Sequence, residues 1–484
     1  MKANKLIGGK LFYLLLASCL GLAVLLLEVP PDWAVRGTAV LTADGQASMA
    51  VLVFAVVLWM TEGLPFHITG LFSMLLLTLL RVDSFKEIVM VGFGNHIIIF
   101  FIGILILSSF ITASGLGRRI SVFLLSKTGN RTAFIVLGFL FVGAILSMWI
   151  TNMAVAAMLM PLGRSILQEE GARPLESRFG KALMISAAWG PIIGGIASPA
   201  GAGPNPLAVG FMKEMAGVDI SFLDWMTYGV PAALLLVLPA WGILMLCFRP
   251  EMKTLKKSRH ELEEEYRALP PMGREEILTL AVFILTVFLW LTIPWWERWL
   301  GISIPISLPV LFTACLFFFP RMSRIRWPEI EKEVSWNGIL LVVSGISLGM
   351  MLYRTGAANW LSVVTLSGIQ GLHPLLQVLA VVLIVSLLKI AFSSNTVTAT
   401  IIIPIMIALA GNLNIEVVSI TLPAALTSSL AFILVTSSPT NVIPYSAGYF
   451  RIKDMALAGL AMTAVGAVIL SVSMYVIGRF TGLY

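Results

Sequence analysis

Two polar interruptions of apolar sequence decide the fold: SMWITNMAVAAMLMP at 147–161 and AFSSNTVTATIIIP at 391–404. Each is centred on an asparagine, Asn152 or Asn395, and a proline closes each stretch at the same distance from it. Each also has a polar partner downstream, SPAGAGPNP at 198–206 and TSSPTN at 436–441. Asparagine and proline leave backbone groups without helical partners, and lipid cannot satisfy them, so such breaks persist only where they line a cavity. Two breaks in each half therefore predict one polar site inside a membrane protein, an arrangement found in secondary transporters.

Composition places the chain in a bilayer. Of its 484 residues 58% are hydrophobic and 12% are charged, and the mean hydropathy is +0.95, too apolar for a soluble chain of this length. The net charge of +7 does not indicate nucleic acid, because the basic residues fall between apolar spans, where they set membrane orientation. Cys19, Cys247 and Cys315 lie in apolar runs and offer no disulfide framework.

The apolar spans predict an all-α polytopic membrane protein with about 11 transmembrane helices in two repeats. We expect an N-terminal helix and loop at 1–46, a first repeat at 47–248, a cytoplasmic linker at 249–275 and a second repeat at 276–484. The repeats are expected to be inverted, because inversion lets one cavity open to either side by exchanging the conformations of the two halves. The lysines at positions 2, 5 and 10 and the basic linker predict a cytoplasmic N-terminus, with the protein in the cell (inner) membrane.

Broken helices supply two kinds of polar group. Half-helix N-termini present free amides that suit anions, and the loose carbonyls of the breaks suit a hard cation such as sodium. Ser394, Asn395 and Thr396 add hydroxyl and amide groups without adding charge. Such residues also join transmembrane helices in many proteins, but helix association does not explain two pairs in register with prolines. The pattern predicts a neutral site that holds an anion beside a cation.

Other classes fit the sequence less well. A cation/proton antiporter would carry a buried Asp or Glu at the breaks, and neither residue type occurs in them. An enzyme would need a nucleophile, a base or a metal set, and the four histidines are scattered. The GxSxG match at 345–349 lies within an apolar span and not on a strand-turn-helix elbow. We therefore predict neither an enzyme nor a resident cofactor.

The paired Ser-Asn-Thr-like motifs and their downstream partners resemble the divalent anion/sodium symporter family, the di- and tricarboxylate and sulfate transporters that include the INDY proteins. The resemblance runs from about residue 47 to 480 and includes TEGLP at 61–65 and GVDISFLDW at 217–225. It implies two re-entrant hairpins whose tips meet helix breaks at mid-membrane, and scaffold and transport domains that work as an elevator. It also implies a homodimer in membrane lipid and a small anionic substrate of the succinate, malate, citrate or sulfate class.

The resemblance also implies ligands. The residues expected to contact substrate are Thr151, Asn152, Ser394, Asn395, Thr396, Ser438 and Pro439. The residues expected near sodium are Ser147, Thr151, Asn152 and Gly201 in the first half, and Ser394, Asn395 and the Ser437 carbonyl in the second.

Four places depart from the family pattern. Met153 stands where a third motif hydroxyl is expected, and the downstream partners, at 203–205 and 439–441, each lack one proline of the family pair. Lys389 places a cation within a membrane span, where an ammonium costs at least about 2.5 kcal/mol and so needs a partner. It either snorkels or binds carbonyls, or it stands beside the second motif in place of a sodium ion.

The sequence thus predicts a secondary active transporter of small divalent anions, most simply di- or tricarboxylates, in symport with sodium. The alternatives are a sodium-independent carboxylate exchanger, which Lys389 favours, and a sulfate carrier of the same architecture.

Overall fold

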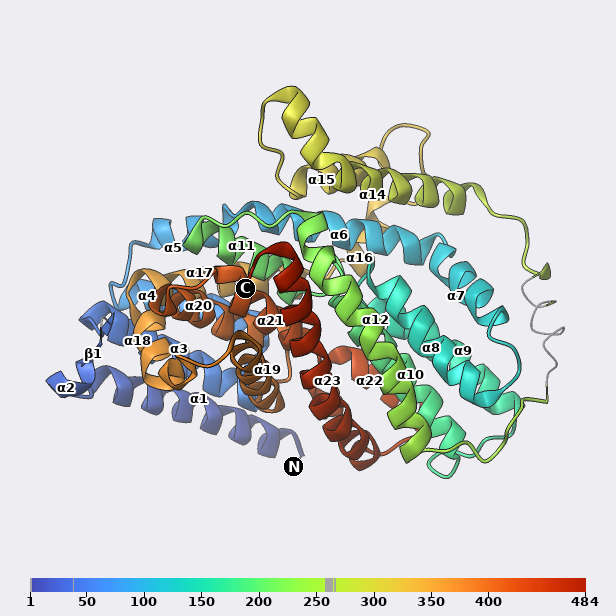
Figure 1. Cartoon of the computed structure of the whole chain (residues 1–484), viewed down its shortest axis with the longest axis horizontal. Helices are drawn as coiled ribbons and strands as arrows, with labels where there is room; N and C mark the ends of the chain where they lie inside the picture. Colours follow the sequence, from blue (N-terminus) through green and yellow to red (C-terminus); the bar gives the residue numbers. More distant parts are fainter. Residues whose placement is uncertain (1, 38, 257–263, 265–266) are drawn as a thin grey trace.

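The computed structural model describes residues 2–37, 39–256, 264 and 267–484, and it is built almost wholly of helices (Figure 1). Among these residues nine helices are long and apolar enough to cross a membrane. The prediction of an all-α polytopic membrane protein is confirmed. Part of the expected linker, at 257–263 and 265–266, lies outside the described residues.

The chain begins with a long helix and a two-stranded antiparallel ribbon, followed by the helices of the first half. The N-terminal elements are α1 (Lys2–Leu26), α2 (Pro31–Ala34), β1 (Val35–Arg36) and β2 (Ala39–Val40). The first half comprises α3 (Ala43–Thr61), α4 (Phe66–Leu79), α5 (Phe85–Phe93), α6 (His96–Ala113), α7 (Leu116–Ser126), α8 (Thr132–Ser147), α9 (Asn152–Glu169), α10 (Arg178–Gly195), α11 (Pro204–Ala216) and α12 (Phe222–Cys247).

The second half repeats the order of the last five of these helices. Its elements are α14 (Arg274–Leu300), α15 (Ser307–Leu316), α16 (Trp327–Glu333), α17 (Trp336–Arg354), α18 (Ala357–Leu366), η1 (Ser367–Ile369), α19 (Pro374–Ala391), α20 (Asn395–Leu413), α21 (Val417–Ser429), η2 (Val435–Ser437), α22 (Pro439–Tyr445) and α23 (Ile452–Thr481). Helices α8 to α12 correspond to α19 to α23, because each set is interrupted at an asparagine-centred motif and again at its downstream partner.

The first interruption of each repeat is the tip of a helical hairpin. Thr132, at the start of α8, donates its backbone N–H to the Lys253 carbonyl at 3.1 Å, and Glu170, just after α9, accepts from the Lys256 N–H at 2.8 Å. Both outer ends therefore meet one short segment, so the chain reverses between α8 and α9. In the second repeat, the start of α19 and the end of α20 both reach the α18–η1 segment, through Gln377 and Asn412.

The broken helices of one repeat pack against the hairpin of the other. Helix α11 contacts α20 and α21, and α22 contacts α9 and α10, so the contacts are exchanged between the halves. Helices α12 and α23 lie side by side across the middle of the molecule, whereas α1 and the α14–α15 pair lie on opposite edges (Figure 1). This reciprocal packing brings all four breaks into one bundle.

Small residues allow the closest helix contact in this bundle. A Cβ on Gly194 of α10 would lie 2.0 Å from the Ala144 carbonyl oxygen of α8, so only glycine permits this approach. Nearly every residue of α10 is buried, including Trp189 and its neighbour Gly190. The hairpin therefore rests on a tightly packed support, which fixes the position of its tip.

The described start of the expected linker binds the base of the hairpin bundle. The Glu251 carboxylate accepts hydrogen bonds from the Ser177 hydroxyl and, at 2.9 Å, from the Phe179 N–H at the start of α10. Burial raises the pKa of this carboxyl group, but the hydrogen bonds lower it by a larger amount. The pKa therefore lies below its ordinary value. The carboxylate thus satisfies the free amides at the N-terminus of α10.

Replacing this cap should give a pH-dependent loss of stability. Because the folded-state pKa is depressed, the stabilisation is fully present above the unfolded pKa of about 4.3 and disappears as pH falls below it. We expect Glu251→Gln to lower the melting temperature of the purified protein at pH 7, and the difference from wild type to shrink below about pH 4.3. Thermal unfolding in detergent across this pH range measures it, with the exposed Glu176→Gln as control. A difference that stays constant down to pH 3 would contradict the role of the charge.

Candidate functional site

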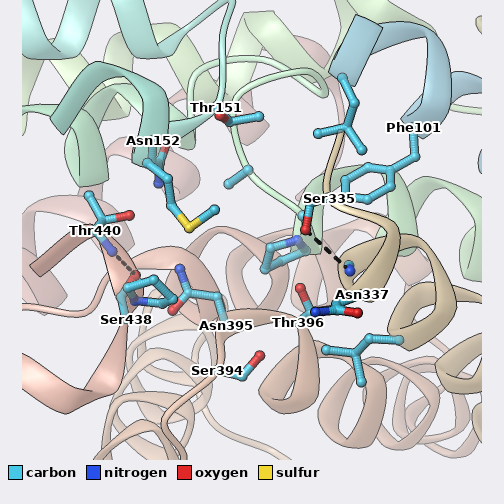
Figure 2. A pocket seen from close by; sticks show the side chains of 18 of the residues that line it. Phe101, Thr151, Asn152, Ser335, Asn337, Ser394, Asn395, Thr396, Ser438 and Thr440 are labelled. Atoms are coloured by element: carbon cyan, nitrogen blue, oxygen red, sulfur yellow. Dashed lines mark hydrogen bonds between the residues drawn. The ribbon is translucent and has the colours of Figure 1, made fainter. Parts of the chain in front are cut away.

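The two asparagine motifs line one cavity of about 420 Å³ (Figure 2). The structure brings together nine of the predicted positions or their neighbours at this cavity: Thr151, Asn152, Met153, Gly201, Ser394, Asn395, Thr396, Ser438 and Pro439. Figure 2 shows Asn152 and Asn395 approaching the cavity from opposite sides. The predicted meeting of the two motifs in a single site is present in the structure.

Each motif begins a helix at the cavity. Thr151 caps α9 by accepting from the Ala154 N–H at 3.4 Å, and Ser394 caps α20 by accepting from the Val397 N–H at 3.4 Å. Serine and threonine favour this position because their oxygens satisfy one of the free amides of the first turn. The remaining amides and the positive end of each helix dipole face the same space, which suits an anion.

The downstream breaks are braced by a second pair of asparagines. Asn205 donates from Nδ2 to the Gly195 and Ser198 carbonyl oxygens, both at 2.7 Å. Asn441 donates from Nδ2 to the Ala431 and Leu434 carbonyls at 2.8 and 3.1 Å, and these acceptors lie the same numbers of residues upstream as in the first repeat. Both asparagines are fully buried. They satisfy the carbonyls that each helix break leaves free. The two downstream breaks are therefore stabilised in the same way.

The first break holds a cluster of oxygen atoms beside the cavity. One end of the Asn152 amide lies 2.9 Å from the Gly201 carbonyl oxygen, 2.6 Å from Ser147 Oγ and 3.1 Å from the Pro191 carbonyl oxygen. The hydrogen-bond pattern assigns this end as nitrogen, because it faces only acceptors. A hard cation among these oxygens would favour the opposite orientation, with the amide oxygen turned toward it. These residues can therefore hold a small cation, although Ser147 itself is buried behind the cavity lining.

The downstream break of the second repeat differs from that of the first because a lysine binds it. Lys389, on α19, is 3% exposed and donates from Nζ to the Ser437 carbonyl oxygen at 2.8 Å. Ser437 and Lys389 lie outside the cavity lining. Asn395 donates to the Ser429 carbonyl at 3.3 Å, while its buried Oδ1 has no hydrogen-bond partner among the described residues. The carbonyl predicted to bind sodium is thus bound to a lysine.

The rest of the cavity wall comes from helices outside the two five-helix sets, α8 to α12 and α19 to α23. It is formed by Pro65, Phe66, His67, Phe101, Ile104, Leu105, Ser335, Asn337, Gly338 and Leu341. Among the described residues that line the cavity, none is Asp, Glu, Lys or Arg. The only sequence signals for this wall are His67, two residues after the TEGLP turn, and the polar Ser335 and Asn337 at the start of an apolar span. Their meeting with the breaks depends on packing that no local pattern reveals.

Ser347, the central residue of the GxSxG match, has an ordinary packing role. It lies inside α17, is fully buried, and donates to the Ile88 carbonyl oxygen at 2.7 Å. Within the described residues no group of three His, Cys, Asp or Glu side chains could hold a metal.

Comparison with models of protein families identifies the family of this chain. Residues 13–481 match the family model described as "Sodium:sulfate symporter transmembrane region". The chain belongs to this family. The family resemblance read from the Asn152 and Asn395 motifs is thereby confirmed.

Individual relatives agree with this family membership. A sodium-dependent dicarboxylate transporter, SdcS, from Staphylococcus saprophyticus is 29% identical and covers 96% of this chain and 91% of its own. SdcS of Staphylococcus aureus strain USA300 is 28% identical, with 97% and 91% covered.

Solved structures agree with the fold alone. The Alcanivorax borkumensis YdaH transporter superposes with a TM-score of 0.56 at 14% identity, covering 99% of this chain and 98% of its own. MtrF of Neisseria gonorrhoeae, described as one of a class of antimetabolite efflux pumps, gives 0.55 at 13% identity, covering 97% and 94%. This family member thus has the general architecture of known transporters.

Proposed function

We propose that the protein is a secondary active transporter that carries a small divalent anion, a di- or tricarboxylate, in symport with sodium. The observation that carries the proposal is the cavity itself, where two helix N-termini and two asparagine motifs meet and where no described lining residue is Asp, Glu, Lys or Arg. Amide and hydroxyl dipoles bind carboxylates there without holding them irreversibly. The substrate ligands we propose are those predicted from the sequence: Thr151, Asn152, Ser394, Asn395, Thr396, Ser438 and Pro439.

Sodium is proposed to bind at the first break. The Gly201 carbonyl oxygen and Ser147 Oγ both lie within about one hydrogen-bond length of one end of the Asn152 amide, and Thr151 caps the adjoining helix. Unwound carbonyls and amide oxygens are the ligands that transporters offer to sodium. The ion would add positive charge beside an otherwise neutral cavity, so the dianion binds best when sodium is present. The curated relatives, which are named as sodium-dependent dicarboxylate transporters, support the same assignment.

Uptake into proteoliposomes tests the function. Labelled succinate, malate, citrate and sulfate are offered with an inward sodium gradient, with equal sodium on both sides, and with choline in its place. We expect concentrative uptake of at least one carboxylate with the gradient and little with choline. Uptake of sulfate alone would favour the inorganic-anion alternative, which the family description also includes. Equal uptake in choline that requires internal substrate would favour the exchanger, and no uptake of any anion would contradict the proposal.

Met153 offers a test of substrate contact at the first break. Its side chain is 40% exposed, lines the cavity, and corresponds in the repeat to Thr396. Met153→Thr should supply a hydroxyl, whose hydrogen bond contributes about 1 kcal/mol and so lowers the KM for a carboxylate about fivefold. Met153→Leu, which has similar volume and no hydroxyl, is the matched control. If both variants lower KM equally, the effect comes from loss of the methionine side chain and not from the added hydroxyl.

The larger assembly follows the family resemblance. We propose that the five-helix repeats form the transport domain, that the remaining helices form a homodimeric scaffold, and that the inverted repeats move as an elevator. We also propose that the N-terminus and the segment 249–275 lie in the cytoplasm of a cell with the protein in its inner membrane, because both segments are basic. Labelling of single cysteines introduced at Lys10 and Lys253 from each side of sealed membranes tests the orientation, and light scattering of the purified protein tests the dimer.

A further inference from the structure

Lys389 is a buried cation whose contact coincides with a predicted ion ligand. Its side chain, on α19, is enclosed by the protein and donates from Nζ to the Ser437 carbonyl oxygen at 2.8 Å. Within the described residues it forms no ion pair with a carboxylate. A lysine that snorkels would reach water or headgroups, and this one does not. The ammonium is instead directed at the helix break of the second repeat.

The repeat makes the comparison with the first break direct. The residue of the first repeat that corresponds to Lys389 is the apolar Leu146, and the residue that corresponds to Ser437 is Gly201. In the first break the Gly201 carbonyl faces the Asn152 amide, which also meets the neutral Ser147 hydroxyl. In the second break the matching carbonyl faces an ammonium, and Ile390 takes the position of the serine. The first break presents neutral polar groups to a dissociable cation, whereas the second carries a covalently attached ammonium.

We propose that the Lys389 ammonium takes the place of the second coupling ion, so that sodium binds only at the first break. This inference rests on the proposed function and specifies its ion stoichiometry. Both cations would lie beside one cavity, because Asn152 and Asn395 line it together. One sodium ion and one ammonium balance the two charges of a dicarboxylate, and the loaded site is then neutral overall.

A fixed cation also changes how the empty carrier returns. Sodium can leave with the substrate, whereas the ammonium stays and crosses the membrane uncompensated in the empty carrier. Moving an uncompensated charge through a low-dielectric environment is unfavourable, so return is faster with a new dianion bound. The carrier therefore exchanges anions faster than it accumulates them.

The wild-type protein supplies the first measurement. Initial rates of carboxylate uptake as a function of sodium should give a Hill coefficient near one, and counterflow with internal substrate should exceed net uptake severalfold. Sodium should also raise the melting temperature of the purified protein without substrate, with a one-site concentration dependence. A Hill coefficient of two or more, together with equal rates of exchange and net uptake, would overturn the proposal.

Lys389→Met removes the charge and keeps the length of the side chain. It frees the Ser437 carbonyl for a second sodium ion, and Asn395 Oδ1 already has no partner among the described residues, so we expect at least a tenfold loss of uptake at low sodium and a steeper sodium dependence. Lys213→Met is the matched control, since Lys213 is a partly exposed lysine paired with Asp219 at 2.7 Å. Lys389→Arg keeps a charge and should keep the shallow sodium dependence. An unchanged sodium dependence in Lys389→Met would show that the lysine is structural.

The melting measurement separates this inference from the proposed function. If no anion is transported but sodium stabilises wild type with one-site behaviour and Lys389→Met with two-site behaviour, the ion assignment stands and the substrate assignment fails. If carboxylates are transported and both proteins bind sodium at two sites, the substrate assignment stands and the role of Lys389 fails. A variant that does not fold leaves the wild-type Hill coefficient and melting curve as the deciding results.

Discussion

Asn395→Ala and Thr396→Ala should each reduce carboxylate transport at least tenfold. Asn395 carries a buried Oδ1 without a partner among the described residues, and its Nδ2 is held only by the Ser429 carbonyl at 3.3 Å. Thr396 lines the same cavity, and its Oγ1 lies so near α11 that a Cβ on Gly203 would meet it at 2.7 Å. Loss of a hydrogen bond to a charged ligand costs about 1.5–3 kcal/mol, which corresponds to about a tenfold to hundredfold change in affinity.

The measurement is the initial rate of uptake as a function of substrate, normalised to the amount of folded protein. We expect a raised KM, because the lost contacts hold the ground-state anion. Thr396→Ser keeps the hydroxyl and should recover most of the affinity. Ser347→Ala is the control, because that serine is buried in α17, away from the cavity, and binds only the Ile88 carbonyl. Wild-type kinetics in both Asn395→Ala and Thr396→Ala, at normal abundance, would contradict the assignment of these ligands.

The sequence predicts the breaks because their chemistry is local. Asn152 and Asn395 stand in apolar runs where a continuous helix would be expected, and a polar group in hydrocarbon needs a protein partner. Regular spacing of the prolines then identifies the repeat without any knowledge of packing. The structure adds that Asn205 and Asn441 hold equivalent pairs of carbonyls, a detail that composition cannot supply.

The opposite wall of the cavity could not be predicted in the same way. His67 and Asn337 lie at the beginnings of α4 and α17, where a polar residue is ordinary, and they meet the breaks only through the packing of distant helices. Burial is equally hidden from local sequence. Ser147 and Ser437 are expected at the site, yet the structure places both behind the cavity lining, where they contact Asn152 and Lys389. Their roles as ion ligands therefore remain predictions.

The reciprocal packing links the four breaks through direct helix contacts. Helix α11 follows the downstream break of the first repeat and packs against α20, the helix that begins at Ser394. Helix α22 packs in the same way against α9. A displacement at one break is therefore transmitted to the opposite motif through direct contact, and substitutions at the closest contact points should have the largest effects.

Gly195→Ala should abolish most transport, with a loss of about a hundredfold. Gly195 ends α10, and a Cβ there would lie 2.2 Å from the end of the Asn152 amide that faces Gly201 and 2.7 Å from its other end, closer than any real contact. The Asn152 amide would have to turn away and leave both the Gly201 carbonyl and Ser147 Oγ. Two hydrogen bonds of about 1.4 kcal/mol each correspond to about a hundredfold in binding.

The result should appear mainly as a weakened response to sodium, because the displaced amide belongs to the proposed ion cluster. Titration of sodium at fixed carboxylate measures the half-saturating concentration, and size-exclusion profiles report whether the variant is folded. Gly242→Ala is the matched control, since a Cβ on this helical glycine of α12 meets nothing within 4 Å. A folded Gly195→Ala protein with wild-type sodium affinity would show that Asn152 does not hold the ion. If Gly195→Ala lowers the affinity for sodium while Gly242→Ala leaves it unchanged, the first break is the coupling site. Both substitutions add one methyl group to a helical glycine, and they differ in what that methyl group touches.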